Sequence, residues 1–242
     1  QLDGTKMFKP EIGLLMNITP DHLDRYEYQL QNYINSKFRL IRNMDSGSKF
    51  IYYSDDEIIT KELASKNTPA TKIPVSLKSS GTPVFYDGAM MQFNLSEKFS
   101  IAQADTTLKG PHNLINTMAA VSAVFLAGAK LESIREGLKT FKNAPHRLEP
   151  VGVVNGVEFI NDSKATNVDS VVYALGSYKQ PLVWIAGGID KGNDYNLIKD
   201  QVKEKVKTLI CLGKDNQKLK DFFGGIVPVI RETQSVEELV HI

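Results

Sequence analysis

The apolar positions of the first 145 residues predict a mixture of helices and strands. Apolar side chains recur at helical spacing over residues 28–43, 112–127 and 131–141, which predicts helices there. Another helix is predicted over residues 55–65, with Ser54 as its N-cap. Short apolar runs between turn signals predict strands at residues 12–16, 50–53, 72–74, 83–86, 90–93 and 99–102.

After Pro145 the pattern becomes a regular alternation of strands and helices. Strands are predicted at residues 150–154, 157–161, 182–186, 208–212 and 226–229. Helices are predicted at residues 168–178, 197–206, 215–222 and 236–242. Asn155-Gly156 is typical of a two-residue hairpin turn between the first two strands. The alternation indicates βαβ units, so we expect an α/β protein with a mostly parallel sheet and two domains, residues 1–145 and 146–242.

Composition narrows the function classes. The chain has 242 residues, is 42% hydrophobic and carries a net charge of +1, which gives no electrostatic reason to expect nucleic acid or anionic membrane as a partner. No apolar run reaches membrane-spanning length. The single Cys211 excludes an internal disulfide and a multi-cysteine metal site, and its apolar neighbours predict a buried strand position. The single cysteine is consistent with a protein of the reducing cytoplasm. The chain opens at Gln1 without an initiator Met, so we expect an excerpt of a longer protein.

The stretch Asn161-Asp162-Ser163-Lys164-Ala165-Thr166-Asn167 is the strongest chemical signal. It follows a predicted strand and precedes a predicted helix, so it gathers an ammonium, hydroxyl groups and helix N–H groups at one place. Such groups suit an anionic ligand. The same residue types also cap helices, and this alternative stays open for the stretch by itself.

Five further clusters have matching polar chemistry. They are residues 21–26 with His22, Lys37 on the helix predicted over residues 28–43, residues 110–116 with Asn116, residues 145–149 with Arg147, and residues 186–192 with Lys191. His22 could bind a metal, or the acids beside it could favour a helix start. Lys37 could be held neutral by desolvation, but a lysine on such a face usually extends to water. Asn116 could bind a heterocycle or cap its helix. Arg147 could bind a phosphate or form a salt bridge at a hinge. Gly187-Gly188 could expose backbone N–H groups to an anion or could simply form a tight turn.

Taken together and in order, these clusters resemble the Mur ligases. The matching motifs are Asn-Ile-Thr-Pro-Asp-His-Leu-Asp-Arg-Tyr, Ser-Lys-Phe-Arg, Gly-Pro-His-Asn-x-x-Asn-x-x-Ala-Ala, Pro-His-Arg-Leu-Glu, Asn-Asp-Ser-Lys-Ala-Thr-Asn and Gly-Gly-x-Asp-Lys. The resemblance runs from residue 1 to about residue 232. The motif that begins at Asn161 favours the branch of the family that adds D-glutamate.

The resemblance implies a partial central ATP-binding domain over residues 1–145 and a truncated, Rossmann-like, amino-acid-binding domain over residues 146–242. It implies a cytoplasmic, monomeric enzyme of peptidoglycan synthesis that uses ATP and Mg²⁺. Its substrates would be UDP-N-acetylmuramoyl-L-alanine and D-glutamate. ATP would phosphorylate the carboxylate of the first substrate, and the amine of D-glutamate would attack the acyl phosphate to form an amide. Such a site crowds anions together, so it needs a metal ion and cationic donors.

The resemblance also implies roles for single residues. Two would act in catalysis as magnesium ligands: His22, and Lys37 as the carbamate that CO₂ forms with its amine. Three would contact the adenine, phosphate and ribose of the nucleotide: Asn116, Arg147 and Asp162. Three would contact the D-glutamate end: Lys164, Thr166 and Lys191.

The chain also departs from the family. The phosphate-binding motif Gly-x-x-x-x-Gly-Lys-Ser/Thr is absent. We also expect the family's acidic metal ligand, its UDP-sugar domain and its final segment to lie outside residues 1–242. The isolated chain is therefore expected to be inactive. Two alternatives stay open: a superfamily ligase for another amino acid, such as a relative of folylpolyglutamate synthase, and a non-catalytic nucleotide-binding module.

Overall fold

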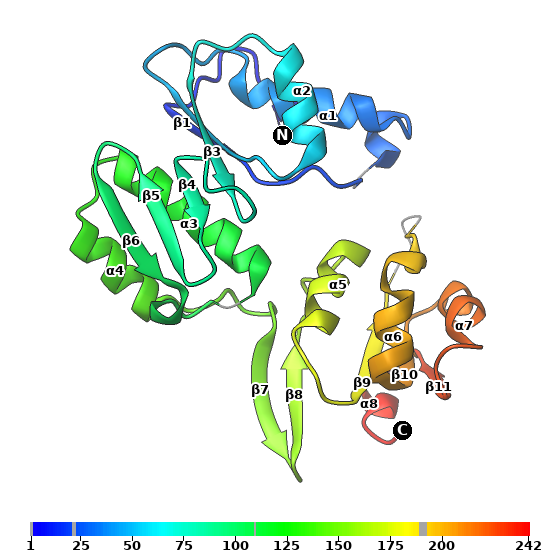
Figure 1. Cartoon of the computed structure of the whole chain (residues 1–242). Coiled ribbons are helices and arrows are strands. Elements are labelled where there is room, and N and C mark those ends of the chain that lie inside the picture. Colours follow the sequence, from blue (N-terminus) through cyan, green and yellow to red (C-terminus); the bar gives the residue numbers. More distant parts are fainter. Residues whose placement is uncertain (1, 21–22, 109, 189–192) are drawn as a thin grey trace. The chain divides into compact units, whose positions relative to one another are not determined.

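The chain divides into two compact units, Gln1–Lys142 (unit 1) and Asn143–Ile242 (unit 2). The structure is a computed structural model and describes residues 2–20, 23–108, 110–188 and 193–242 (Figure 1). Within those ranges no helix is both long and apolar enough to cross a membrane.

Unit 1 is built on a six-stranded mixed sheet whose strands follow one another in chain order. The strands are β1 (Ile12–Leu15), β2 (Lys49–Tyr53), β3 (Thr71–Ser76), β4 (Val84–Tyr86), β5 (Met90–Asn94) and β6 (Lys98–Ala102). Strands β1 to β4 pair in parallel, and β4 to β6 form an antiparallel meander. Stacking of Phe93 on Phe99, with ring centroids 4.7 Å apart, joins the last two strands.

Helices cover both faces of this sheet. They are α1 (Leu30–Phe38), α2 (Glu57–Ser65), α3 (Pro111–Leu126) and α4 (Leu131–Thr140), with short 3₁₀ turns η1 (Leu2–Gly4), η2 (Leu23–Tyr26), η3 (Arg39–Ile41) and η4 (Gln103–Asp105). Successive strand residues point to opposite faces. Phe50 therefore packs in the core with α1 and α2, and Ile51 packs in the core with α3 and α4.

Unit 2 contains a three-stranded parallel sheet in the order β11-β10-β9 and a separate hairpin of β7 and β8. Its elements are β7 (Glu149–Val154), β8 (Val157–Asn161), α5 (Val168–Gly176), β9 (Leu182–Gly187), η5 (Tyr195–Ile198), α6 (Lys199–Lys205), β10 (Val206–Leu212), α7 (Gln217–Phe223), β11 (Val229–Thr233) and α8 (Val236–Leu239). The core joins α5, α6 and α7 to one face of the sheet. Cys211 lies there on β10, fully buried, as the sequence predicts.

The α/β class is confirmed, but some predicted elements are wrong in detail. The first helix starts at Leu30, because Glu27 and Tyr28 both have φ of 56°, which is left-handed and cannot continue a helix. The cap of α2 is Asp56, whose side chain accepts from the Ile59 N–H. Ser54 instead bonds the carbonyl of Val75 through its hydroxyl.

One strand prediction of unit 2 is wrong at its start. The last strand begins at Val229, where pairing with β10 starts, and not at residue 226. Strands β7 and β8 pair with each other, as the predicted hairpin turn requires, and lie outside the parallel sheet. Strand β9 is only half-buried: Val183 is 62% exposed and Ile185 47% exposed, because the core helices pack on the other face.

Candidate functional site

Lys37 lies near the end of α1 and is half-buried. Its Nζ atom is 5.0 Å from the centroid of the Tyr33 ring, one turn earlier on the same helix. Tyr33 is buried and meets the Tyr26 ring edge-on at 5.3 Å. The amine is thus held by an aromatic face, which suits an ammonium group.

The expected metal ligand His22 lies outside the described residues, and so does Lys191. Among the residues that the structure describes, no group of three or more His, Cys, Asp or Glu side chains is arranged to hold a metal ion. The Lys37 amine points at a ring, and Mg²⁺ prefers oxygen ligands. The described residues alone do not supply a magnesium site.

The opposite side of α1 lines a polar cavity of about 470 Å³. Asn32, Asn35, Ser36 and Arg39 recur at helical spacing there, and Lys37 is not among the lining residues. At its edge the Tyr26 hydroxyl lies within hydrogen-bond distance of Asp3 at 2.9 Å and Ser36 at 3.2 Å. The hydrogen bond from Ser36 lowers the pKa of Asp3, with help from Tyr26 and Arg39. This network ties η1 and η2 to α1.

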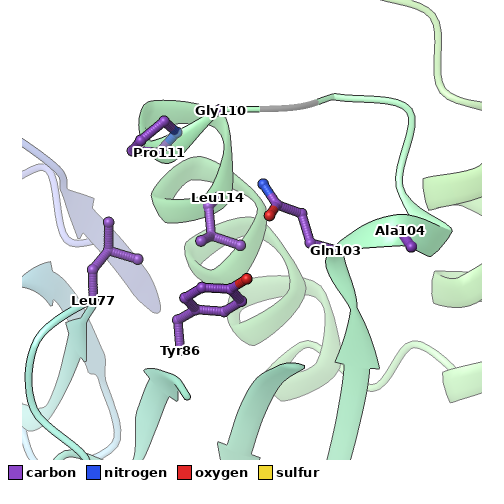
Figure 2. Close-up of a pocket in the computed structure, with 7 residues that line it drawn as sticks. All are labelled: Leu77, Tyr86, Gln103, Ala104, Gly110, Pro111 and Leu114. Atoms are coloured by element: carbon purple, nitrogen blue, oxygen red, sulfur yellow. The ribbon is translucent and has the colours of Figure 1, made fainter. Parts of the chain in front are cut away.

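Asn116 is exposed on α3, in the second turn of the helix. The helix begins after Gly110, whose φ of 90° requires glycine, and Pro111 occupies the first turn where no N–H partner is needed. A cavity of about 660 Å³ opens beside this end, lined by Leu77, Tyr86, Gln103, Ala104, Gly110, Pro111 and Leu114 (Figure 2). Asn116 follows Leu114 by two residues and is therefore on a different face of the helix.

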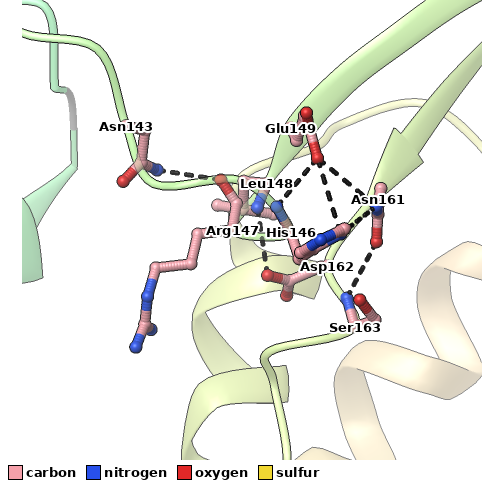
Figure 3. Close-up of polar contacts among 8 residues, drawn as sticks. All are labelled: Asn143, His146, Arg147, Leu148, Glu149, Asn161, Asp162 and Ser163. Atoms are coloured by element: carbon pink, nitrogen blue, oxygen red, sulfur yellow. Dashed lines mark hydrogen bonds and ion pairs between the residues drawn. The ribbon is translucent and has the colours of Figure 1, made fainter.

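Arg147 and Asp162 come together at the base of the β7–β8 hairpin. The backbone N–H of Leu148 donates to Oδ1 of Asp162 at 3.0 Å, and the exposed Arg147 side chain extends away from the hydrogen-bonded residues (Figure 3). His146 and Leu148, on either side of Arg147, have φ of 67° and 43°. Left-handed conformations cost roughly 1–2 kcal/mol for such residues, so this turn is held by its contacts.

Lys164 and Thr166 are exposed in the segment between β8 and α5. The backbone N–H of Lys164 donates to the His146 carbonyl at 3.0 Å, which joins this segment to the Arg147 turn. Asn167 caps α5 by accepting from the Ser170 N–H at 2.9 Å. The motif therefore contains the helix cap and also places a lysine and a threonine at the surface beside it.

The carboxyl ends of β9 and β10 approach each other at glycines. A Cβ atom on Gly187 would lie 1.7 Å from the carbonyl oxygen of Leu212, and Gly188 has a φ of 103°. Glycine is needed at both positions for steric reasons. This explains the Gly-Gly pair without a ligand, and the rest of that cluster lies outside the described residues.

Hydrogen bonds of Leu148 and His146 join the turn that carries Arg147 to the segment of Asp162 and Lys164, and Lys37 and Asn116 lie on two different helices of unit 1. It also shows polar residues to which the sequence reasoning gave no role, namely Asn143, Glu149 and Asn161. Asn161 and Glu149 stand inside two of the motifs, so the signal was present. The sequence does not show which of these side chains contact one another across the hairpin.

The two units define an α/β protein. Residues 1–124 match the model of the Mur ligase middle domain, and residues 146–242 match the model described as Mur ligase, glutamate ligase domain. The chain belongs to the Mur ligase family.

Curated relatives are similar in sequence to this chain over its whole length. A UDP-N-acetylmuramoylalanine–D-glutamate ligase of Cytophaga hutchinsonii is 46% identical over 100% of this chain and 54% of its own length. In solved structures, MurF of Acinetobacter baumannii has a TM-score of 0.71 at 19% identity, covering 96% of this chain and 52% of that one. MurF of Thermotoga maritima in complex with ADP has a TM-score of 0.68 at 14% identity, covering 96% of this chain and 55% of that one. These structures establish the fold. The chain spans about half the length of the curated relatives it matches.

Proposed function

We propose that this chain is part of an ATP-dependent ligase that joins D-glutamate to UDP-N-acetylmuramoyl-L-alanine in peptidoglycan synthesis. The observation that carries the proposal is the similarity to D-glutamate ligases over the full chain. The site residues support it, since cationic and amide side chains gather in motifs of matching order. The complete ligase would act in the cytoplasm as a monomer.

Nucleotide binding is assigned to Asn116, Arg147 and Asp162. The Arg147 guanidinium is exposed, always charged and able to bond two phosphate oxygens at once. The Asp162 carboxylate suits the hydroxyls of a ribose, which are donors. Asn116 has an amide that can both donate to and accept from an adenine edge.

Binding of D-glutamate is assigned to Lys164, Thr166 and Lys191. Lys164 and Thr166 are exposed next to the capped start of α5, so an ammonium and a hydroxyl can meet a carboxylate there. Cations that hold the carboxylates also orient the amine for attack on an acyl phosphate. Magnesium would be bound by His22 and by Lys37 as its carbamate, and it would neutralise phosphate charge.

The test is turnover by the complete ligase that contains this chain, measured as phosphate release and as formation of the amide product. We expect product with D-glutamate, ATP and Mg²⁺ and none with L-glutamate. Lys164→Ala should raise KM for D-glutamate at least about tenfold, because a charged hydrogen bond is lost. The isolated 242-residue chain should show no ligation, because it carries no phosphate-binding glycine-rich motif.

Three results would contradict the proposal. Preference for L-glutamate would favour a relative of folylpolyglutamate synthase. ADP binding without turnover of any amino acid would favour a non-catalytic nucleotide-binding module. Ligation by the isolated chain would overturn the expectation that residues beyond it are needed.

A further inference from the structure

The turn that carries Arg147 has an unusual backbone. His146 and Leu148 are both left-handed, with φ of 67° and 43°, and neither is glycine. Such residues persist where the surroundings fix them, and they cluster at functional sites. The contacts that fix this turn therefore decide where the Arg147 side chain can reach.

Asn161, the last residue of β8, makes several of these contacts (Figure 3). Its Nδ2 atom lies 2.7 Å from Nδ1 of His146 and donates to Oε2 of Glu149 at 3.3 Å. Its Oδ1 atom accepts from the backbone N–H of Ser163 at 3.1 Å. One side chain thus uses both amide hydrogens and its oxygen, and links the Arg147 turn to the segment that follows Asp162.

Glu149 completes the link from the other strand. Its Oε2 atom also accepts from the backbone N–H of His146 at 2.8 Å. The same turn is held by Asn143, whose Nδ2 atom donates to the Arg147 carbonyl at 2.8 Å. Asn161 therefore supports the carboxylate that holds the first left-handed residue.

An amide is the group that fits at position 161. The Nδ2 atom faces the Glu149 carboxylate, which accepts hydrogen bonds, and Nδ1 of His146, which accepts when the ring proton is on Nε2. An aspartate there would set two carboxylates about 3.3 Å apart and repel Glu149. The shape would be unchanged, but the donor would be lost.

We propose that Asn161 is a positioning residue for nucleotide binding. It fixes the turn of His146 to Glu149 against the segment of Asp162, so that the Arg147 guanidinium and the Asp162 carboxylate face the same nucleotide. The inference rests on the proposed function, because it takes Arg147 and Asp162 as nucleotide contacts. Asn161 itself touches neither substrate nor nucleotide.

The test uses the complete ligase and isothermal titration with ADP alone. Asn161→Asp should weaken ADP binding by about 10-fold or more, as expected for the loss of a hydrogen bond to a charged group. KM for ATP should rise while KM for D-glutamate stays within about twofold, because an aspartate oxygen can still accept from the Ser163 N–H and so holds the segment that carries Lys164. If Asn161 only stabilised the fold, the substitution would change both KM values or neither of them.

A double variant that removes the charge repulsion supplies the second test. In Asn161→Asp with Glu149→Gln, the glutamine removes the negative charge that repels the new aspartate, and its carbonyl oxygen can still accept from the His146 N–H. We expect the double variant to bind ADP more tightly than Asn161→Asp but more weakly than the wild type, because the repulsion is removed and the donor at position 161 is still absent. Asn155→Asp, at the tip of the same hairpin, is the matched control and should bind ADP like the wild type, since aspartate also tolerates a left-handed turn.

The outcomes separate the two hypotheses. If the wild-type ligase binds no ADP, the proposed function fails. If the wild type binds ADP and Asn161→Asp binds it equally well, the positioning role is wrong. It is also wrong if the double variant is folded, as judged by circular dichroism, and binds ADP no better than Asn161→Asp. Should Asn161→Asp not fold, a folded double variant that binds ADP more weakly than the wild type supports the role, and one with wild-type affinity contradicts it.

Discussion

At the scale of single residues, backbone proximity is the strongest constraint in unit 2. Gly187 ends β9 where the chain passes next to the end of β10. A side chain there would meet the carbonyl oxygen of Leu212 at 1.7 Å, and a backbone atom cannot rotate away as the tip of a side chain can. Glycine at this position therefore sets the spacing between the two strands.

We predict that Gly187→Ala destabilises unit 2 by about 3 kcal/mol or more, because the two strands must separate to admit the methyl group. The measurement is urea unfolding followed by circular dichroism. Gly152→Ala in β7 is the control: a Cβ atom there meets nothing within 4 Å, so the change should stay within about 0.5 kcal/mol. Equal unfolding midpoints for the two variants would show that the backbone at Gly187 does not lie this close to the carbonyl of Leu212.

At the scale of elements, one carboxylate fixes both a helix and a loop in unit 1. Asp56 caps α2 through Oδ1, which accepts from the Ile59 N–H at 2.9 Å. Ile18 lies in the loop after β1, and its backbone N–H donates to Oδ2 of Asp56 at 3.1 Å. The cap is thus also a tertiary contact.

Asp56→Ala should lower the free energy of unfolding by about 1–3 kcal/mol, because a helix cap and a second hydrogen bond are lost together. Asp56→Ser keeps a capping oxygen on a shorter side chain and should fall between the wild type and the alanine variant. Thermal unfolding of the three proteins measures the order. If the serine variant is as unstable as the alanine variant, the cap contributes little and the bond to Ile18 dominates.

At the scale of the whole molecule, each unit has its own apolar core. Cys211 belongs to the core of unit 2, is fully buried, and is the one cysteine of the chain. Burial raises the pKa of its thiol, and the charge of Glu232 adds to the effect. The thiolate is the reactive form, so both the pKa and the lack of access protect this residue.

We expect a thiol reagent such as Ellman's reagent to label native Cys211 at pH 8 far more slowly than in denaturant, at least about 100-fold, because labelling requires opening of unit 2. Labelling should accelerate as the pH rises above 8, because the exposed thiol of the open state ionises there. Since the pKa is raised in the native state, this ionisation also favours the open state. The colour change of the reagent gives the rate. Labelling as fast in buffer as in denaturant would contradict the burial.

Much of the fold could be predicted because local patterns and tertiary structure agree. The alternation along β2 places Phe50 and Ile51 on opposite faces, and Asn155-Gly156 forms the predicted hairpin turn with φ of 51° and 81°. The residue that caps a helix is harder to predict from the sequence. Ser54 and Asp56 are both good caps by type, and only the geometry of the chain selects the residue whose oxygen reaches a free N–H.

The sequence by itself determined the family, the α/β class and the motifs, because these depend on residue type and order. It also named Arg147, Asp162 and Lys164 before any contact was known. Only the tertiary structure decided that Leu148 bonds Asp162 and that Asn161 bonds Glu149. Such partners are 14 and 12 residues apart, and the pairing of β7 with β8 brings them together. Periodicity predicts which way a side chain faces within its element, whereas its neighbours depend on how elements pack.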